Sequence, residues 1–302
     1  MSWISSGDRV RRSLTRRKSI KLAFSGLSAG YLGANVGAFA ATQAPDMTRS
    51  VPQRAPRALT GSQFAEAVLN MDRQHREDAI LHQLLEGNLP GFLKRLTPVE
   101  LSYKLTDGKT LTATIFAMPE YLSIGSESDY LRIPMNLHTA MSIAERFGFV
   151  LPTKKIVDAI YDQATSQFTP QPLPAGPQMT STEFYRRHNS MIDKQSRTRN
   201  FPVANMVSGH KKDVVITNRL AKKPGQIAIY GWHRATGEPI QPLSTVHGAG
   251  YADYSHGIRL VARMALLEGK LRSVSDILQD ALFANILSDE GPIRVAPALG
   301  SA

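Results

Sequence analysis

The side chains that could carry out chemistry are concentrated between residues 205 and 259. Half of the eight histidines lie in this stretch, together with carboxylates, tyrosines and lysines. Glycines lie beside them, and glycine allows the sharp turns and close backbone approaches of loops that build sites. The polar side chains fall in three segments, 207–213 (VSGHKKD), 230–233 (YGWH) and 253–259 (DYSHGIR). We therefore expect a polar site in the C-terminal part of the chain.

One chemistry that these residues allow is metal-assisted hydrolysis. Histidine and aspartate are the zinc ligands available to a chain that has no cysteine. A bound zinc, or another divalent metal, lowers the pKa of its water towards about 7 and makes hydroxide available at neutral pH. The predicted ligands are His210, Asp213, His247 and His256. No His-x-x-x-His pair is present to place two of them on one helical face.

A second chemistry is acid–base catalysis without a metal. Here Asp213, Glu238 and Asp253 are candidate carboxylates, and His233 or His256 is a candidate proton carrier. Tyr254 is the fourth predicted catalytic residue, because a phenol can stabilise a developing negative charge. A serine nucleophile fits less well, since the chain has no Gly-x-Ser-x-Gly motif.

Four further residues are predicted to bind substrate. Lys211 and Lys212 precede Asp213, and an inward lysine there could hold a carboxylate or phosphate. The ring of Trp232 could serve as a flat platform for a sugar, although core packing is the commoner use of a tryptophan. Arg259 could hold an anion. His188, which follows two arginines on a predicted helix, is expected to face solvent.

The order of the predicted helices and strands that must position these residues indicates an α+β fold. Strands and helices do not alternate strictly, so we expect a mixed or antiparallel sheet with flanking helices in one large domain. We divide the chain into a flexible lead-in, an N-terminal helix–hairpin–helix half, a proline-rich connector and a C-terminal half that carries the site. The boundaries are 41–60, 61–167, 168–180 and 181–302.

Local patterns predict the individual elements. Apolar spacing indicates one helix over 62–86 and another over 258–267, and Asp107-Gly108 indicates a hairpin between strands 99–105 and 110–118. Segments 121–124 and 130–133 are expected to extend that sheet. Capping residues predict three more helices, which begin at Asn136, at Thr180 (with Glu183 in a capping box) and at Ser273. A fourth helix is predicted to begin after Pro152. The Thr180 helix should run to about Lys194, and strands are expected over 213–217 and 226–230.

The first forty residues look like an export signal. Arg16 and Arg17 precede an uncharged stretch from 22 to 40, which ends in the small-x-small pattern Ala38-Phe39-Ala40. This segment resembles a twin-arginine leader, although Ser19 replaces the usual aromatic residue. The resemblance implies export to the periplasm or the medium, with Ala40 as the expected cleavage position. It also implies a mature chain with no integral membrane segment. The alternative is that residues 22–40, which are just long enough to span a bilayer, remain as an uncleaved anchor.

Composition limits the classes of function. The formal charge is +11, but residues 1–40 hold seven basic side chains and one acidic one, which leaves 29 basic and 24 acidic groups. A surplus of five is too small to indicate nucleic-acid binding. The absence of cysteine excludes a thiol nucleophile and disulfides.

These observations favour an exported hydrolase that acts on a cell-wall or extracellular polymer or peptide. The alternative is a non-catalytic envelope protein that binds or scaffolds a glycan, peptide or protein partner. A catalyst requires the predicted groups to converge on one reacting atom, whereas a binding protein can spread them over a face.

Overall fold

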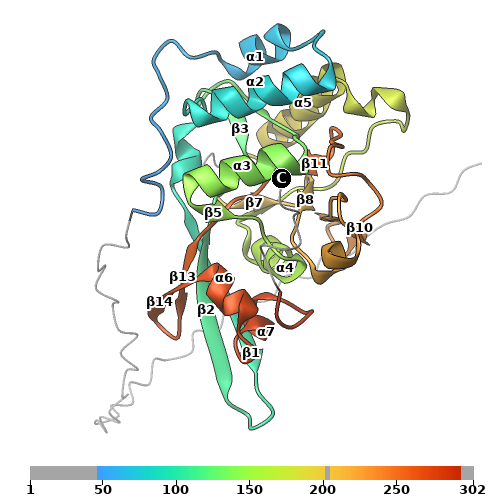
Figure 1. Ribbon diagram of the computed structural model, residues 1–302. Coiled ribbons are helices and arrows are strands. Elements are labelled where there is room, and N and C mark those ends of the chain that lie inside the picture. The colour runs from blue at the N-terminus through green and yellow to red at the C-terminus, as the bar shows by residue number, and fades with distance from the viewer. Residues whose placement is uncertain (1–45, 201–204, 294–302) are drawn as a thin grey trace, which may run out of the picture. The chain divides into compact units, whose positions relative to one another are not determined.

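The computed structural model of this chain describes residues 46–200 and 205–293 (Figure 1). These described residues all belong to one compact unit. The predicted leader and its cleavage after Ala40 lie outside the described residues. The part of the predicted lead-in that is described contacts the fold, because the guanidinium of Arg54 donates to Asn88 at 2.9 Å.

The N-terminal helical region consists of two helices, α1 (Gly61–Ala67) and α2 (Arg73–Leu85). The prediction of one helix over 62–86 was therefore wrong. The chain turns between the two helices, and Asp72 caps α2 by accepting a hydrogen bond from the backbone N–H of His75 at 3.0 Å. Helix α1 has already ended at Ala67, and Asp72 begins the next helix because its side chain satisfies an N–H group that has no intrahelical partner.

The main sheet is built around the predicted hairpin, whose strands β1 (Thr97–Lys104) and β2 (Thr110–Ala117) are paired along their full length. The hairpin is the long element that runs to the lower end of Figure 1. The strand order is β14-β13-β2-β12-β5, with β1 also paired to β2. The additional strands are β5 (Phe149–Val150), β12 (Val261–Ala262), β13 (Met264–Leu267) and β14 (Lys270–Ser273).

This pairing contradicts the predicted helix over 258–267. The segment contains strands β12 and β13, and β13 pairs with β2 and turns back into β14. Short apolar runs are compatible with either a helix or a buried strand. Here the strand forms because β13 can hydrogen-bond to the edge of β2 that β1 does not occupy. Residues 113–114 and 266–267, which are far apart in the chain, therefore share one sheet.

The helices beside this sheet follow the predictions more closely. Helix α3 (Leu137–Phe147) is capped by Asn136 and ends at Gly148, and helix α4 (Lys154–Gln163) follows Pro152. Helix α5 (Thr182–Arg199) is longer than predicted, and its cap is Ser181 instead of Thr180. Ser273 caps α6 (Val274–Gln279), which is followed by α7 (Ala284–Leu287).

A second sheet carries the predicted site segments. Its strand order is β10-β9-β8-β11, with antiparallel β10–β9 and β9–β8 pairs and a parallel β8–β11 pair. Its members are β8 (Lys212–Val214), β9 (Ile229–His233), β10 (Pro239–Ser244) and β11 (His256–Gly257). The predicted strands over 213–217 and 226–230 are thus present with shifted ends. The architecture confirms the predicted α+β class.

Two small sheets complete the described strands. Strands β3 (Ser123–Gly125) and β4 (Tyr130–Arg132) pair only with each other, so the prediction that these segments extend the hairpin sheet was wrong. Strands β6 (Ser166–Gln167) and β7 (Val207–Ser208) form a parallel pair. Short 3₁₀ helices span Gly91–Lys94, Pro177–Thr180 and Asn218–Lys222.

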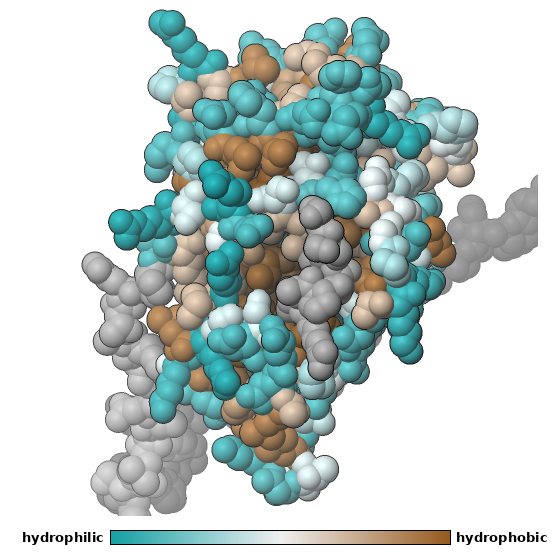
Figure 2. Space-filling view, viewed as in Figure 1, coloured by the Kyte–Doolittle hydropathy of each residue, from teal (hydrophilic) through white to brown (hydrophobic). Residues whose placement is uncertain are grey.

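The face of the molecule shown in Figure 2 is mainly hydrophilic, and its hydrophobic side chains form separate patches. The apolar core includes residues from the hairpin, α3, α4, α6 and the strands of the second sheet. Among the described residues, no helix combines the length and the hydropathy that crossing a bilayer requires.

Candidate functional site

The three polar segments predicted from the sequence meet in the second sheet. Strand β8 lies between β9 and β11, so that Lys212 is opposite His256 and Asp213 is opposite both Gly257 and Tyr230. Residues far apart in the chain are therefore brought side by side by strand pairing. The side chains nevertheless divide into several groups with different partners.

The first group is centred on the buried carboxylate of Asp253. One oxygen accepts hydrogen bonds from the backbone N–H of Ser255 at 2.8 Å and from its hydroxyl at 2.6 Å. The other accepts from the hydroxyl of Tyr251 at 3.1 Å and lies 3.9 Å from the Nε2 atom of His256. Burial by itself would raise the pKa of Asp253, but His256 and the Ser255 hydrogen bonds outweigh it and lower this pKa. Asp253 is thus held as an anion beside an imidazole.

His256 is fully buried, and neither of its ring nitrogens has a hydrogen-bond partner among the described residues. Burial lowers its pKa to about 4, against the opposing attraction of Asp253. Its ring lies 5.7 Å from that of Tyr251 and 6.4 Å from that of His247, which stacks on Tyr251. His247 and Tyr251 are partly exposed, so this group connects the buried imidazole with the surface.

The second group contains Lys211, which is 1% exposed. Its ammonium donates to the backbone carbonyl of Tyr254 at 2.6 Å, and burial lowers its pKa to about 7. The hydroxyl of Tyr254 is occupied, because it accepts from the N–H of Leu173 at 2.7 Å and lies 3.2 Å from the carbonyl of that residue. Lys212 is less buried and lies 5.3 Å from the ring of Trp232. We refer to Lys211, His188, Trp232 and Tyr254 as the lysine–aromatic cluster.

A buried charge network lies behind these groups. The Nε2 atom of His210 is 2.8 Å from Glu120, whose other oxygen accepts from Arg132 at 2.8 Å. Burial would raise the pKa of Glu120, but His210 and Arg132 outweigh it and hold this pKa well below its usual range. Arg132 in turn donates to Asp193 at 2.7 Å. His210 is therefore tied to a structural ion-pair network.

Asp213 lies in the same interior but has different partners. It accepts a hydrogen bond from the hydroxyl of Tyr121 at 2.7 Å and is 3.9 Å from the Nε atom of Arg259. Arg259 is also buried, and it donates to the carbonyls of Met118 and Val207. Burial raises the pKa of Asp213 to about 6, because desolvation outweighs the effects of Arg259 and Tyr121.

The raised pKa of Asp213 predicts an unusual dependence of stability on pH. The folded state favours the protonated carboxyl, so its ionisation should destabilise the fold as pH rises from about 4 to about 6. Asp213→Asn should remove this penalty and raise the free energy of unfolding at pH 7 by about 2–3 kcal/mol. Urea unfolding at pH 4 and pH 7 measures the effect, with the exposed Asp107→Asn as control. A variant that is less stable than the wild type at pH 7 would contradict this account.

His233 on β9 has a separate set of partners. Its Nε2 atom is 3.1 Å from Asp158 on α4, and its ring stacks on Tyr161 at 4.4 Å. Asp158 also accepts from the hydroxyl of Tyr230 and from Lys154. His233 therefore does not share a carboxylate with His256.

The predicted metal ligands are likewise divided. His210 is paired with Glu120, and Asp213 with Tyr121. His247 stacks on Tyr251, and its ring is 6.4 Å from that of His256. Within residues 46–200 and 205–293, no group of three or more histidine, aspartate or glutamate side chains is arranged to hold a metal ion. A metal at this site stays a prediction.

Several residues of this region were not identified from the sequence. Glu120, Arg132 and Asp158 lie outside the three polar segments. Glu120 is 90 positions from His210 and Asp158 is 75 positions from His233, and no local pattern connects them. His188 was expected to face solvent, but it is fully buried among Trp232 and Tyr254. Its position one turn after Phe184 and Tyr185 on an amphipathic helix was the available signal.

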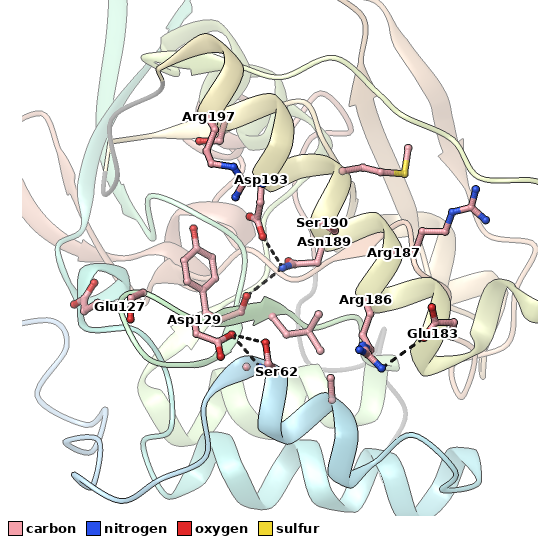
Figure 3. Close-up of a pocket in the computed structure, with 17 residues that line it drawn as sticks. Ser62, Glu127, Asp129, Glu183, Arg186, Arg187, Asn189, Ser190, Asp193 and Arg197 are labelled. Atoms are coloured by element: carbon pink, nitrogen blue, oxygen red, sulfur yellow. Dashed lines mark hydrogen bonds and ion pairs between the residues drawn. The ribbon is translucent and has the colours of Figure 1, made fainter.

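A surface pocket of about 900 Å³ lies between α1, the β3–β4 turn and α5 (Figure 3). None of the predicted site residues lines it. Arg186 is 3.7 Å from Glu183, and Asp129 accepts hydrogen bonds from Ser62. Arg187 and Arg197 also line the pocket, as do Asn189 and Asp193, which hold Arg132 of the buried network.

Comparison with protein-family models, with curated proteins and with solved structures finds no match to this chain.

Proposed function

We propose that this protein is an exported hydrolase that acts on a cell-wall or extracellular polymer through the His256–Asp253 group. The observation that carries the proposal is the buried His256, whose two ring nitrogens are unpaired and whose Nε2 atom lies 3.9 Å from Asp253. A buried imidazole without a partner is uncommon, and it is what a group that must accept a proton from a bound reactant requires. The leader-like residues 1–40 supply the expectation of export.

The arrangement supports acid–base chemistry. His256 is neutral at pH 7, because burial places its pKa at about 4, so that it can accept a proton from water. Asp253 then stabilises the imidazolium that forms, since an anion close to a developing cation lowers its free energy in a desolvated site. The partly exposed rings of His247 and Tyr251 pack beside that of His256. Lys211, which immediately precedes β8, is a further titratable group, and burial lowers its pKa to about 7.

The test is hydrolysis of purified peptidoglycan by the full chain, measured as released soluble fragments. His256→Ala should reduce the rate by about 10²–10⁴-fold, which is the usual contribution of a general acid or base. The control is His138→Ala, which changes an exposed histidine in the first turn of α3. A His256→Ala protein that keeps the wild-type rate would remove this residue from the mechanism.

A metal-assisted version of the same hydrolysis has a separate test. If a divalent metal takes part, the purified chain should contain about one zinc or similar ion, and chelation should lower both its activity and its Tm. A chain that stays fully active after chelation has removed all metal would exclude the metal-assisted mechanism and support acid–base catalysis by His256.

The second candidate function is a non-catalytic envelope protein that binds a glycan, peptide or protein partner. The pocket beside α5 favours it, because the guanidinium groups of Arg187 and Arg197 have no ion pair with other described residues. In this case purified peptidoglycan should be bound without being cleaved, and Arg197→Gln should weaken binding. Arg146→Gln, at an exposed position on α3, is the control.

A further inference from the structure

The lysine–aromatic cluster is a contiguous buried group drawn from four parts of the chain. The ring of His188 on α5 lies 5.0 Å from that of Tyr254 and 6.0 Å from that of Trp232 on β9. The rings of Trp232 and Tyr254 are 6.3 Å apart, and all three pairs meet edge to face. Lys211 joins the cluster through its 2.6 Å hydrogen bond to the carbonyl of Tyr254.

The cluster contains polar atoms that lack partners. The indole N–H of Trp232 and both ring nitrogens of His188 are buried and make no hydrogen bond to the described residues. Lys211 has one acceptor, the carbonyl of Tyr254, for its three donors, and it forms no ion pair with a described carboxylate. Folded proteins rarely leave buried donors unpaired, because each one loses its hydrogen bonds to water without compensation.

The backbone at Trp232 is also strained. Its φ angle is 57°, in the left-handed region that bulky residues seldom adopt, and the preceding Gly231 has a φ of 104°. The N–H of Trp232 donates to the carbonyl of Lys211 at 3.0 Å, which joins the strained residue to the lysine of the cluster. Strain of this kind persists where the surrounding structure enforces it, and such positions are concentrated at functional sites.

We propose that Lys211, His188 and Trp232 form a binding site for the carbonyl oxygen of an amide or ester substrate. The unpaired groups are chiefly donors: an indole can only donate, an ammonium can only donate, and a neutral imidazole has one N–H. A carbonyl oxygen needs donors, and its demand for them increases as it becomes an oxyanion. A cation or a donor-rich ligand would leave the same groups unpaired.

This inference rests on the proposed function, and it assigns the hydrolase to acyl bonds. His256, which lies opposite Lys212 on the neighbouring strand, takes a proton from water as the water oxygen bonds to the carbonyl carbon. The carbonyl electron pair moves onto the oxygen held by the cluster. When the carbonyl re-forms, the carbon–nitrogen or carbon–oxygen bond breaks, and the leaving atom takes the proton from His256.

Stability measurements separate a ligand site from a structural cluster. His188→Phe and Trp232→Phe remove unpaired polar atoms and keep aromatic bulk, so each variant should have a Tm equal to or above that of the wild type. Each should also lose about 10²-fold or more of the peptidoglycan-hydrolysing rate, as expected when an oxyanion donor is removed. If both variants lower the Tm, or if the wild type hydrolyses peptidoglycan and both variants keep its rate, the proposal is overturned.

A binding measurement tests the site without catalysis. The chain contains two tryptophans, so in a full-length Trp3→Phe background Trp232 is the only source of tryptophan fluorescence. Acetate should change this fluorescence in a saturable way, whereas ethylammonium, which is of similar size but offers donors, should not. The acetate response should disappear in His188→Phe and persist in His256→Ala. An identical response to both probes, or one that His188→Phe leaves unchanged, would contradict the proposal.

The two proposals fail in different ways. If no polymer is cleaved but acetate binds as expected, the oxygen-binding site stands and the hydrolase proposal falls. If His256→Ala abolishes hydrolysis but acetate does not bind, the hydrolase proposal stands and the oxygen-binding site is overturned.

Discussion

Replacing Arg132 by methionine should lower the free energy of unfolding by about 3–5 kcal/mol, which is the usual cost of removing one partner of a buried ion pair. The side chain of Arg132 is 3% exposed, and its guanidinium is 2.8 Å from Glu120 and 2.7 Å from Asp193. Methionine fills part of the space but leaves the carboxylate of Glu120 buried without its cation. Urea unfolding at pH 7 measures the loss.

The matched control for this prediction is Arg186→Met. Arg186 forms ion pairs with Glu66 and Glu183, but its side chain is 44% exposed, so its loss should cost less than about 1 kcal/mol. Equal losses for the two variants would show that burial does not determine the contribution of Arg132.

Arg132→Met should also change how the stability of the fold depends on pH in acid. In the wild type the pKa of Glu120 lies below its unfolded value near 4.5, so its stabilising contribution is present above that pH. The contribution is lost as pH falls towards the lower folded pKa. In Arg132→Met the carboxylate has lost its main permanent cation, so the stability difference between the two proteins should narrow in acid. A difference that stays constant from pH 7 to pH 3 would be inconsistent with this explanation.

Substituting alanine for Gly257 should destabilise the fold by about 1–3 kcal/mol, which is typical of an overpacked core, and should also impair the site. A Cβ atom at Gly257 would lie 2.6 Å from the ring of Tyr121 and 2.7 Å from the Cβ of Lys211. Backbone and side chains must move to relieve these contacts. Since Lys211 belongs to the lysine–aromatic cluster, hydrolysis should fall more than stability alone explains.

Gly250 provides the matched control for that substitution. It belongs to the same region, it has an ordinary φ angle, and a Cβ atom there would have nothing within 4 Å. Gly250→Ala should therefore leave both the Tm and the rate close to wild type. If Gly257→Ala behaves like Gly250→Ala, the packing of β11 against Lys211 and Tyr121 is looser than these distances indicate.

Elements with strong local signals were predictable from the sequence. The Asp107-Gly108 hairpin, the Asn136 cap with Gly148 at the end of α3, and the Ser273 cap of α6 are all present. In each case a few adjacent residues satisfy the backbone groups of the element, so no distant partner is needed. Elements whose identity depends on a partner strand were mispredicted, as the segment over 258–267 shows.

The candidate site was predictable in its residue types but only in part in its geometry. The segments around His210, Trp232 and His256 do meet, because β8, β9 and β11 pair. Their side chains alternate between faces of the strands and acquire separate partners, such as Glu120 for His210 and Asp158 for His233. Those carboxylates come from the other half of the chain, and the sequence contains no local sign of the pairing.

By itself the sequence determined the α+β class, the capped helices, the hairpin and the region in which reactive side chains are concentrated. Only the tertiary structure decided that His256 is unpaired beside Asp253 and that His188 is buried against Trp232. The physical reason is the range of the interactions involved. Caps and turns are satisfied within a few residues, whereas burial and the pairing of a charge depend on segments that only folding brings together.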